Sequence, residues 1–175
     1  LDSTWATLPV ALGLLAHVVA LFRQGSYDAA LSARQGRHVY RGGLALQPGM
    51  AFTIGNVISS AGDTSQPSRH HLVTDHEAVH VWQSRWFGPL YVAIYVAWSS
   101  IGSLVGLVVW ATRRRHQSCR AVVQSCSYYM NPFEWWAYSR DDYWPPHGLV
   151  KGMGWKAPAV RSFAAVRDQS SRPNL

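Results

Sequence analysis

The strongest chemical signal in the sequence is H-E-x-x-H, formed by His76, Glu77 and His80. On a helix, residues four apart lie on one face, so both imidazoles can reach the same metal ion. The carboxylate of Glu77 then stands beside the open coordination position, where it serves as the general base. Three fixed residues also occur together by chance in a chain with eight histidines. The motif therefore needs a third ligand before it indicates a metal centre.

The segment N-P-F-E at 131–134 offers that ligand. Asn is a favourable helix cap and Pro fits the first helical position, so Glu134 falls in the first turn of a helix. Two histidines and one carboxylate with an open position suit zinc best, and non-haem iron is the other metal for that set. We predict Zn²⁺ held by His76, His80 and Glu134.

Two further polar residues follow Glu134 on the same helix face, Tyr138 and Asp141. Tyr138 is predicted to donate a hydrogen bond to a developing oxyanion, and Asp141 to orient a ligand histidine. Zinc lowers the pKa of its bound water to about 7, and Glu77 takes the proton as a carbonyl is attacked. Peptide hydrolysis is the natural reaction of such a site.

Helix capping is the alternative explanation of both glutamates. Asn131 with Glu134, and Thr74 with Glu77, have the spacing of a capping box, in which the carboxylate bonds the backbone at the start of a helix.

Two further histidines precede the motif and are not expected to bind metal. His70 and His71 are expected on a surface loop.

Two apolar segments indicate a membrane. Residues 5–22 carry no formal charge and just reach across a hydrocarbon core as a helix, although a cleaved signal peptide or a buried helix also fits. His17 within this segment is expected to be neutral and hydrogen-bonded. Residues 86–111 carry no charge, are edged by tryptophans and end before three arginines at 113–115. We predict that 86–111 is embedded in the membrane.

The basic residues create a conflict of topology. Arg23, Arg34, Arg37 and Arg41 follow the first apolar segment, and the 113–115 arginines follow the second. Positive flanks favour the cytoplasm, which two simple spans joined by one loop cannot satisfy. Either the first segment does not span, or the second turns back near Ser99, Ser100 and Gly102, or one flank violates the bias.

The rest of the chain predicts a small α+β fold. Short apolar pieces punctuated by glycine, HVYRGGLAL, MAFTIG and NVISS, predict two or three strands within 36–62. Helical patterns follow at the H-E-x-x-H motif, at 116–130 and from 131, and WPPHG ends the last of them. The basic segment from about Lys151 is expected to be a loose tail or a partner-binding arm.

Composition narrows the class of protein. With 48% hydrophobic and 14% charged residues, the chain is not expected to be disordered, and two cysteines are too few for a disulfide scaffold. A net charge of +7 suits anionic lipid or nucleic acid. Nucleic-acid binding is not expected, because the basic residues of the tail lack interleaved stacking aromatics.

The motifs together resemble a group of small, largely uncharacterised bacterial membrane-associated proteins. In that group H-E-x-x-H-x-x-Q, G-P-L-Y and N-P-F-E-x-x-A-Y recur together, here at 76–83, 88–91 and 131–138, and a strand similar to FTIGNVI at 52–58 often comes first. The resemblance covers about 50–142. It implies a gluzincin-type metallopeptidase arrangement with Glu134 as the third ligand and Glu77 as base, and it implies no known substrate.

These observations give one expectation and one alternative. The expectation is an α+β, zincin-like zinc metallopeptidase in the bacterial inner membrane, acting on a peptide or protein at the bilayer. The alternative is a non-catalytic subunit that stabilises a larger complex, docked to other membrane subunits through its basic tail. The predicted organisation is an apolar segment at 1–24, a zincin-like domain at 25–146 that includes 86–111, and a tail at 147–175.

Overall fold

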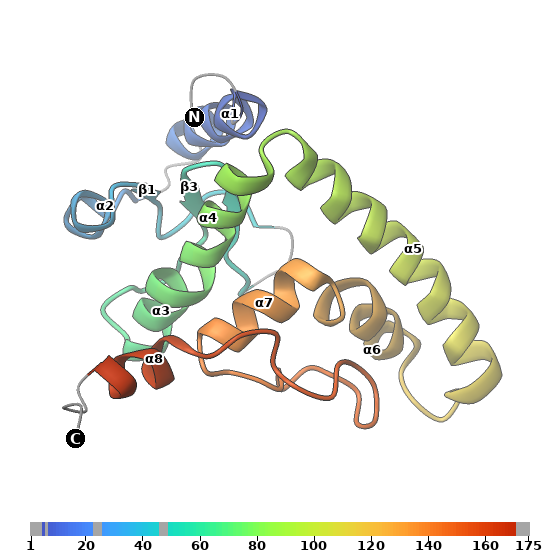
Figure 1. Cartoon of the computed structure of the whole chain (residues 1–175). Coiled ribbons are helices and arrows are strands. Elements are labelled where there is room, and N and C mark those ends of the chain that lie inside the picture. Colours follow the sequence, from blue (N-terminus) through green and yellow to red (C-terminus); the bar gives the residue numbers. More distant parts are fainter. Residues whose placement is uncertain (1–4, 6, 23–25, 46–48, 171–175) are drawn as a thin grey trace. The chain divides into compact units, whose positions relative to one another are not determined.

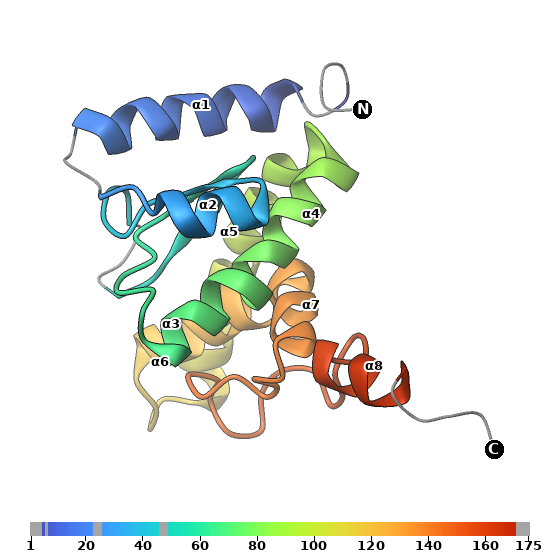
Figure 2. The same cartoon turned by 90° about the vertical axis from the view of Figure 1, so that its left-hand side faces the viewer.

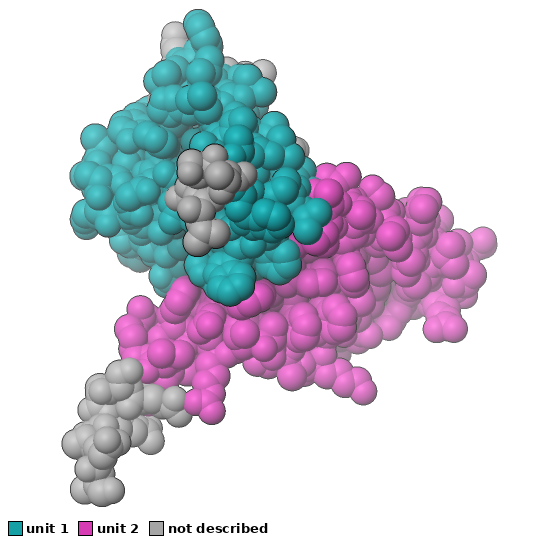
Figure 3. Space-filling view, turned by 45° about the horizontal axis from the view of Figure 1, so that its top comes forward, with its two compact units in different colours: residues 1–92 teal, residues 93–175 magenta. Residues whose placement is uncertain are grey.

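The chain folds into two compact units, residues 1–92 and 93–175, which Figure 3 colours separately. Two parts of the predicted organisation lie outside the described residues: Arg23 of the first basic flank, and residues 171–175 of the predicted tail. The computed structural model describes residues 5, 7–22, 26–45 and 49–170.

A three-stranded sheet lies in the first unit and confirms the predicted short strands. Its strands are β1 (His38–Val39), β2 (Phe52–Ile54) and β3 (Val57–Ser59), in the order β1-β3-β2. β1 runs parallel to β3, and β2 pairs with β3 in the antiparallel sense. A two-residue turn joins β2 to β3, and Gly55 has a positive φ of 56° there, which glycine adopts without strain.

The first apolar segment forms the helix α1 (Thr7–Phe22), which packs against β2 and β3. Small residues make this contact possible, since a Cβ added at Gly13 would lie 3.0 Å from the carbonyl oxygen of Ile54. The opposite face of α1 is apolar and exposed. With 16 residues, α1 is about 24 Å long and is therefore shorter than a hydrocarbon core of about 30 Å. One of its faces is buried in the protein, a contact that neither a membrane anchor nor a signal peptide requires.

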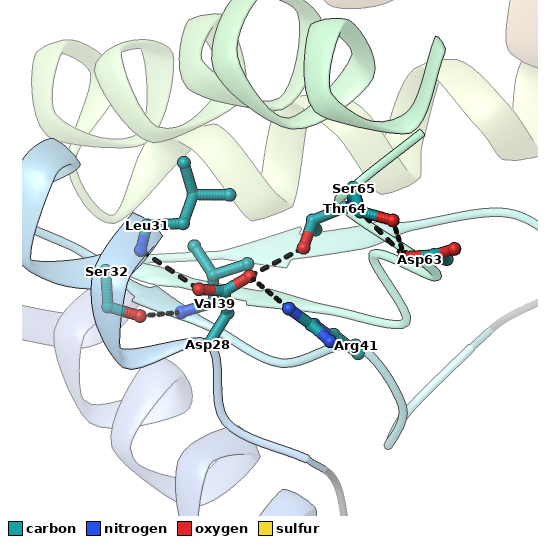
Figure 4. Close-up of polar contacts among 8 residues, drawn as sticks. All are labelled: Asp28, Leu31, Ser32, Val39, Arg41, Asp63, Thr64 and Ser65. Atoms are coloured by element: carbon teal, nitrogen blue, oxygen red, sulfur yellow. Dashed lines mark hydrogen bonds and ion pairs between the residues drawn. The ribbon is translucent and has the colours of Figure 1, made fainter. Parts of the chain in front are cut away.

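The short helix α2 (Ala29–Gln35) is fixed by the carboxylate of Asp28 at its N-terminus. Asp28 accepts hydrogen bonds from the Leu31 N–H at 3.0 Å and the Thr64 hydroxyl at 2.6 Å, and pairs with Arg41 at 3.2 Å (Figure 4). The Thr64 and Leu31 bonds and the Arg41 charge lower the pKa of Asp28. One carboxylate therefore ties α2 to two loops.

A helical run of 21 residues carries the H-E-x-x-H motif. It consists of α3 (Pro67–His71), a π-helical turn η1 (Leu72–His76) and α4 (Glu77–Phe87), which follow one another without a break (Figures 1 and 2). Val73 and Val81 of this run are buried with Leu31 and Ile58 in one apolar cluster. That packing fixes the run beside the sheet.

The second apolar segment forms one long helix, α5 (Leu90–Arg113), whose first three residues belong to the first unit. α5 is continuous through Ser99, Ser100 and Gly102, so the alternative of a break there is wrong. Among the described residues it is the one helix long and apolar enough to cross a membrane, judged by length and composition. Most of its apolar surface is exposed.

Gly102 is a packing position rather than a hinge. In the second unit, α6 (Cys119–Gln124) and a second π-helical turn, η2 (Ser125–Tyr129), lie against α5. A Cβ added at Gly102 would lie 2.6 Å from the Cys126 carbonyl oxygen, and one at Gly106 would lie 2.7 Å from the Cα of Val123. The two glycines, one turn apart, let the backbones approach closely.

After η2 come α7 (Pro132–Arg140) and α8 (Phe163–Ser170). The segment between them, expected to be loose, packs on α7. The ring of Trp155 stacks on Trp135 with centroids 4.4 Å apart, and its Nε1 donates to the Met130 carbonyl at 3.1 Å. The Ala159 N–H donates to the Ser139 hydroxyl at 2.8 Å. The expectation of a loose tail is therefore wrong for this stretch.

Candidate functional site

The two histidines of the motif point their ring nitrogens at one place in the first unit. His76 ends η1 and His80 lies in the first turn of α4, and both side chains are buried. Their Nε2 atoms are 3.3 Å apart. Two imidazole nitrogens bound to a tetrahedral zinc at about 2.0–2.1 Å stand about 3.3–3.4 Å apart. The pair therefore has the separation that a shared zinc ion requires.

The imidazole of His80 is held by two further side chains. Its Nδ1 lies 2.9 Å from Oε1 of Gln83 and 3.3 Å from the hydroxyl of Tyr91. Because the amide oxygen of Gln83 only accepts, Nδ1 carries the proton and Nε2 presents its lone pair. Gln83 is fully buried, so this orientation is not in competition with solvent. Such a partner fixes the tautomer of a metal-binding histidine.

Glu77 follows His76 directly and is also buried. Its Oε2 accepts a hydrogen bond of 2.5 Å from the Thr53 hydroxyl, which comes from β2. The capping-box explanation of Glu77 is wrong, because Thr74 lies inside the π-helical turn and α4 has no side-chain cap. The carboxylate is thus directed toward the sheet rather than toward the backbone at the start of α4.

Glu134 lies in the second unit, in the first turn of α7, and its side chain is buried. Asn131 caps this helix as predicted, with its Oδ1 accepting from the Phe133 N–H at 3.0 Å. The Asn131 N–H donates to the carbonyl of Tyr128, and Oε1 of Glu134 accepts from the Tyr95 hydroxyl at 2.7 Å. The capping-box explanation of Glu134 is therefore wrong as well.

Tyr138 lies one turn beyond Glu134 and hydrogen-bonds with Tyr128. Burial, and after it the negative charge of Glu134, raise the pKa of both phenols above the ordinary value of tyrosine. Both are therefore neutral at physiological pH and able to donate a hydrogen bond. Asp141 is buried at the end of α7, where its Oδ1 accepts from the Tyr143 N–H at 2.9 Å. The roles expected of Tyr138 and Asp141 in a reaction remain predictions.

Each predicted ligand, His76, His80 and Glu134, is buried and offers one atom that could bind a metal ion. Two other histidines, His17 and His71, have partners outside the predicted ligand set. Nδ1 of His17 lies 2.7 Å from the Tyr40 hydroxyl, which confirms that this imidazole is hydrogen-bonded. His70 and His71 lie in the helix α3 and not on a loop as expected, and His71 pairs with Asp75 at 2.8 Å.

Sequence reasoning missed two contacts that position the glutamates. Thr53 lies in the predicted FTIGNVI strand, but nothing in its spacing relates it to Glu77, 24 residues away. Tyr95 lies 39 residues from Glu134, inside an apolar segment in which it looks like an ordinary aromatic residue. The position of Tyr95 one helical turn after Tyr91 of the G-P-L-Y motif is the signal that was available.

Comparisons with protein-family models, with curated proteins and with solved structures find no match to this chain. The family resemblance drawn from the motifs therefore stays a prediction.

Proposed function

We propose that this chain is a membrane-associated zinc metallopeptidase-like protein. In this proposal His76, His80 and Glu134 hold Zn²⁺, and Glu77 is the general base. The observation that carries it is the convergence of the two Nε2 atoms at 3.3 Å, with His80 held in the metal-binding tautomer by Gln83.

The long helix α5 carries two tyrosines whose hydroxyls contact proposed ligands. Tyr91 and Tyr95 are one helical turn apart on α5, on the same face. The hydroxyl of Tyr91 hydrogen-bonds with His80, and that of Tyr95 donates to Glu134. Two tyrosines of α5 thus each contact one proposed ligand.

The residues around the proposed metal have the chemistry that hydrolysis needs. A bound Zn²⁺ supplies Lewis acidity and makes water acidic enough to lose a proton near neutral pH. Glu77, held by Thr53, is the carboxylate that accepts that proton. Tyr138, kept neutral by burial, is the proposed donor to negative charge that develops on the substrate carbonyl.

An extended peptide is the proposed substrate because of the position of β2. Within the described residues β2 pairs with β3 alone and is an edge strand of the sheet. Extended peptides bind to sheet edges through main-chain hydrogen bonds. Thr53 of this strand also holds Glu77, so peptide binding at β2 and the general base are linked by one residue.

We propose that α5 crosses the bilayer and that the protein resides in the bacterial inner membrane. α5 has 24 residues, enough for a hydrocarbon core of about 30 Å. Arginines 113–115 follow its last apolar turn, as basic anchors do at a membrane surface.

Metal content is the first test of the proposal. The full chain, purified in detergent, is expected to carry about one zinc, and His76→Ala and Glu134→Ala are expected to lose it. His70→Ala, which changes a histidine outside the proposed site, is the matched control and should keep the metal. Wild-type protein that remains free of metal after zinc is offered would contradict the proposal.

Peptide hydrolysis with Glu77→Gln as control is the second test. Glu77→Gln is expected to keep zinc and to lose hydrolysis, because only the proton acceptor is removed. A non-catalytic subunit of a larger membrane complex is the second candidate, favoured by the exposed apolar residues of α1 such as Leu14, Leu15 and Phe22. It gains support if the wild type binds zinc, hydrolyses no peptide and co-purifies with a membrane partner.

A further inference from the structure

Two arginines of the first unit lie close together, and no acidic side chain among the described residues pairs with them. Arg37 immediately follows the end of α2, and Arg85 lies in the last turn of α4. The ion pairs of Arg41 with Asp28 and of His71 with Asp75 involve neither of them. Two positive charges are therefore gathered in one place and are not compensated by described protein groups.

Asn56 of the β2–β3 turn holds this pair together. Its side-chain oxygen accepts from Nη2 of Arg85 at 3.2 Å, and its side-chain nitrogen donates to the Gly36 carbonyl at 3.3 Å. Its own carbonyl accepts from the His38 N–H at 2.9 Å. Asn56 thus contacts both neighbours of Arg37 and the guanidinium of Arg85.

The guanidinium of Arg37 is half-buried, and only part of it is used. Nε donates to the Gln35 carbonyl at 3.3 Å, whereas Nη1 is buried and has no hydrogen-bond partner among the described residues. Burial, and after it the charge of Arg85, lower the pKa of Arg37 below the ordinary arginine value. Arginine stays protonated in proteins, so the unfavourable charge persists until an anion offsets it.

We propose that Arg37 and Arg85 form a binding site for a phosphate group. Guanidinium forks match phosphate oxygens in geometry and charge, and two forks on neighbouring elements bind such a group more strongly than one. The site is separate from the histidines and glutamates discussed above.

A lipid headgroup is one source of that phosphate, and free phosphate is the other. The turn that carries Asn56 also lies against α1, with Gly55 in contact with Pro9 and Gly13 near Asn56. On the face turned away from this contact, α1 exposes apolar residues, including Leu14 and Leu15. An exposed apolar helix in the same unit as a phosphate-binding cation pair suits a lipid headgroup as the source.

The test measures thermal unfolding of the full chain in an uncharged detergent. In one arm inorganic phosphate is added, with chloride at equal ionic strength as reference. In the other arm the micelles contain phosphatidylglycerol or, as reference, an uncharged diacylglycerol, which carries no phosphate. Wild type is expected to unfold at a higher temperature with the phosphate-bearing anion. Stabilisation by phosphatidylglycerol alone assigns the lipid source, and stabilisation by inorganic phosphate assigns the free anion.

Arg37→Gln and Arg85→Gln are each expected to weaken the apparent affinity about tenfold, the value of one charge-assisted hydrogen bond. Arg85→Lys, which keeps the charge but loses the fork, should weaken it less. Arg34→Gln on α2 makes the same charge change away from the pair and is expected to bind as wild type. The proposal is overturned if neither anion stabilises the wild type beyond its reference, or if Arg34→Gln loses as much affinity as the other two.

Discussion

The side chain of Gln83 tests whether His80 is a metal ligand held in position by its surroundings. Gln83 is fully buried, and its Oε1 lies 2.9 Å from Nδ1 of His80. Gln83→Leu removes this acceptor with little change in volume. The remaining partner, the Tyr91 hydroxyl, lies farther away at 3.3 Å. In this variant Nδ1 loses its nearer hydrogen-bond acceptor. The imidazole is then no longer held in the tautomer whose Nε2 lone pair can bind a metal ion.

Loss of such a partner usually weakens metal binding 10- to 100-fold, or about 1.4–2.7 kcal/mol. The measurement is competition for zinc between the detergent-purified chain and a coloured chelator. Gln83→Glu keeps an acceptor at the same position and is expected to bind zinc at least as tightly as wild type. Zinc affinity of Gln83→Leu within twofold of wild type would refute the role assigned to Gln83, provided that the apo variant melts cooperatively.

Three further predictions concern the fold. Gly102→Leu should lower the free energy of unfolding by about 1–3 kcal/mol, because even a Cβ at this position would lie 2.6 Å from the carbonyl oxygen of Cys126. Chemical denaturation in detergent measures this free energy, and an unchanged midpoint would contradict the contact. Asp28 has a lowered pKa when folded, so the stability it contributes is present above its unfolded pKa of about 3.9 and is lost as pH falls through the folded value. Melting temperatures between pH 2 and 6 should therefore fall less steeply in Asp28→Asn than in wild type, and parallel curves would exclude the effect. Trp155→Ala should release the segment after α7 by removing the stack on Trp135, which limited proteolysis detects as new cleavage near residue 155; an unchanged digest would show that the stack is not needed.

The elements that could be predicted from the sequence are those with strong local signals. The short strands lie between glycines, and β2 falls within the FTIGNVI segment. Asn131 and the following proline fix the start of α7, and residues 90–111 of the second apolar segment form a helix because they are a long uncharged stretch. Local chemistry decides these features, so one sequence is enough to find them.

Other features depend on contacts between distant residues and gave no local signal. Gly102 looks like a helix breaker, yet it permits close packing with the η2 backbone inside a continuous helix. The tail looks loose because it is poor in aliphatic residues, but the rings of Trp155 and Trp135 attach it to α7. Both errors come from judging a residue by its own propensity when a distant partner determines its conformation.

The candidate ligands could be proposed from the sequence, whereas the residues that contact them could not. His76, His80 and Glu134 follow from motif and spacing, and their burial agrees with that use. The capping boxes could be rejected only with the structure, because the hydroxyls that hold Glu77 and Glu134 come from Thr53 and Tyr95 far away in the chain.

A π-helical turn lies close to each proposed ligand in the sequence: Leu72–His76 contains His76 and continues into α4, and Ser125–Tyr129 is separated from α7 by Met130 and Asn131. A π turn contains one residue more than an α turn, so the side chains before and after it are offset by about 100° around the axis. Deleting one residue within either turn shortens the π turn to an α turn and leaves the helices on both sides intact. These two places are therefore where related sequences are expected to differ by a single-residue insertion or deletion without loss of the fold, and such a length change at 72–76 would rotate α3 relative to α4, which carries His80.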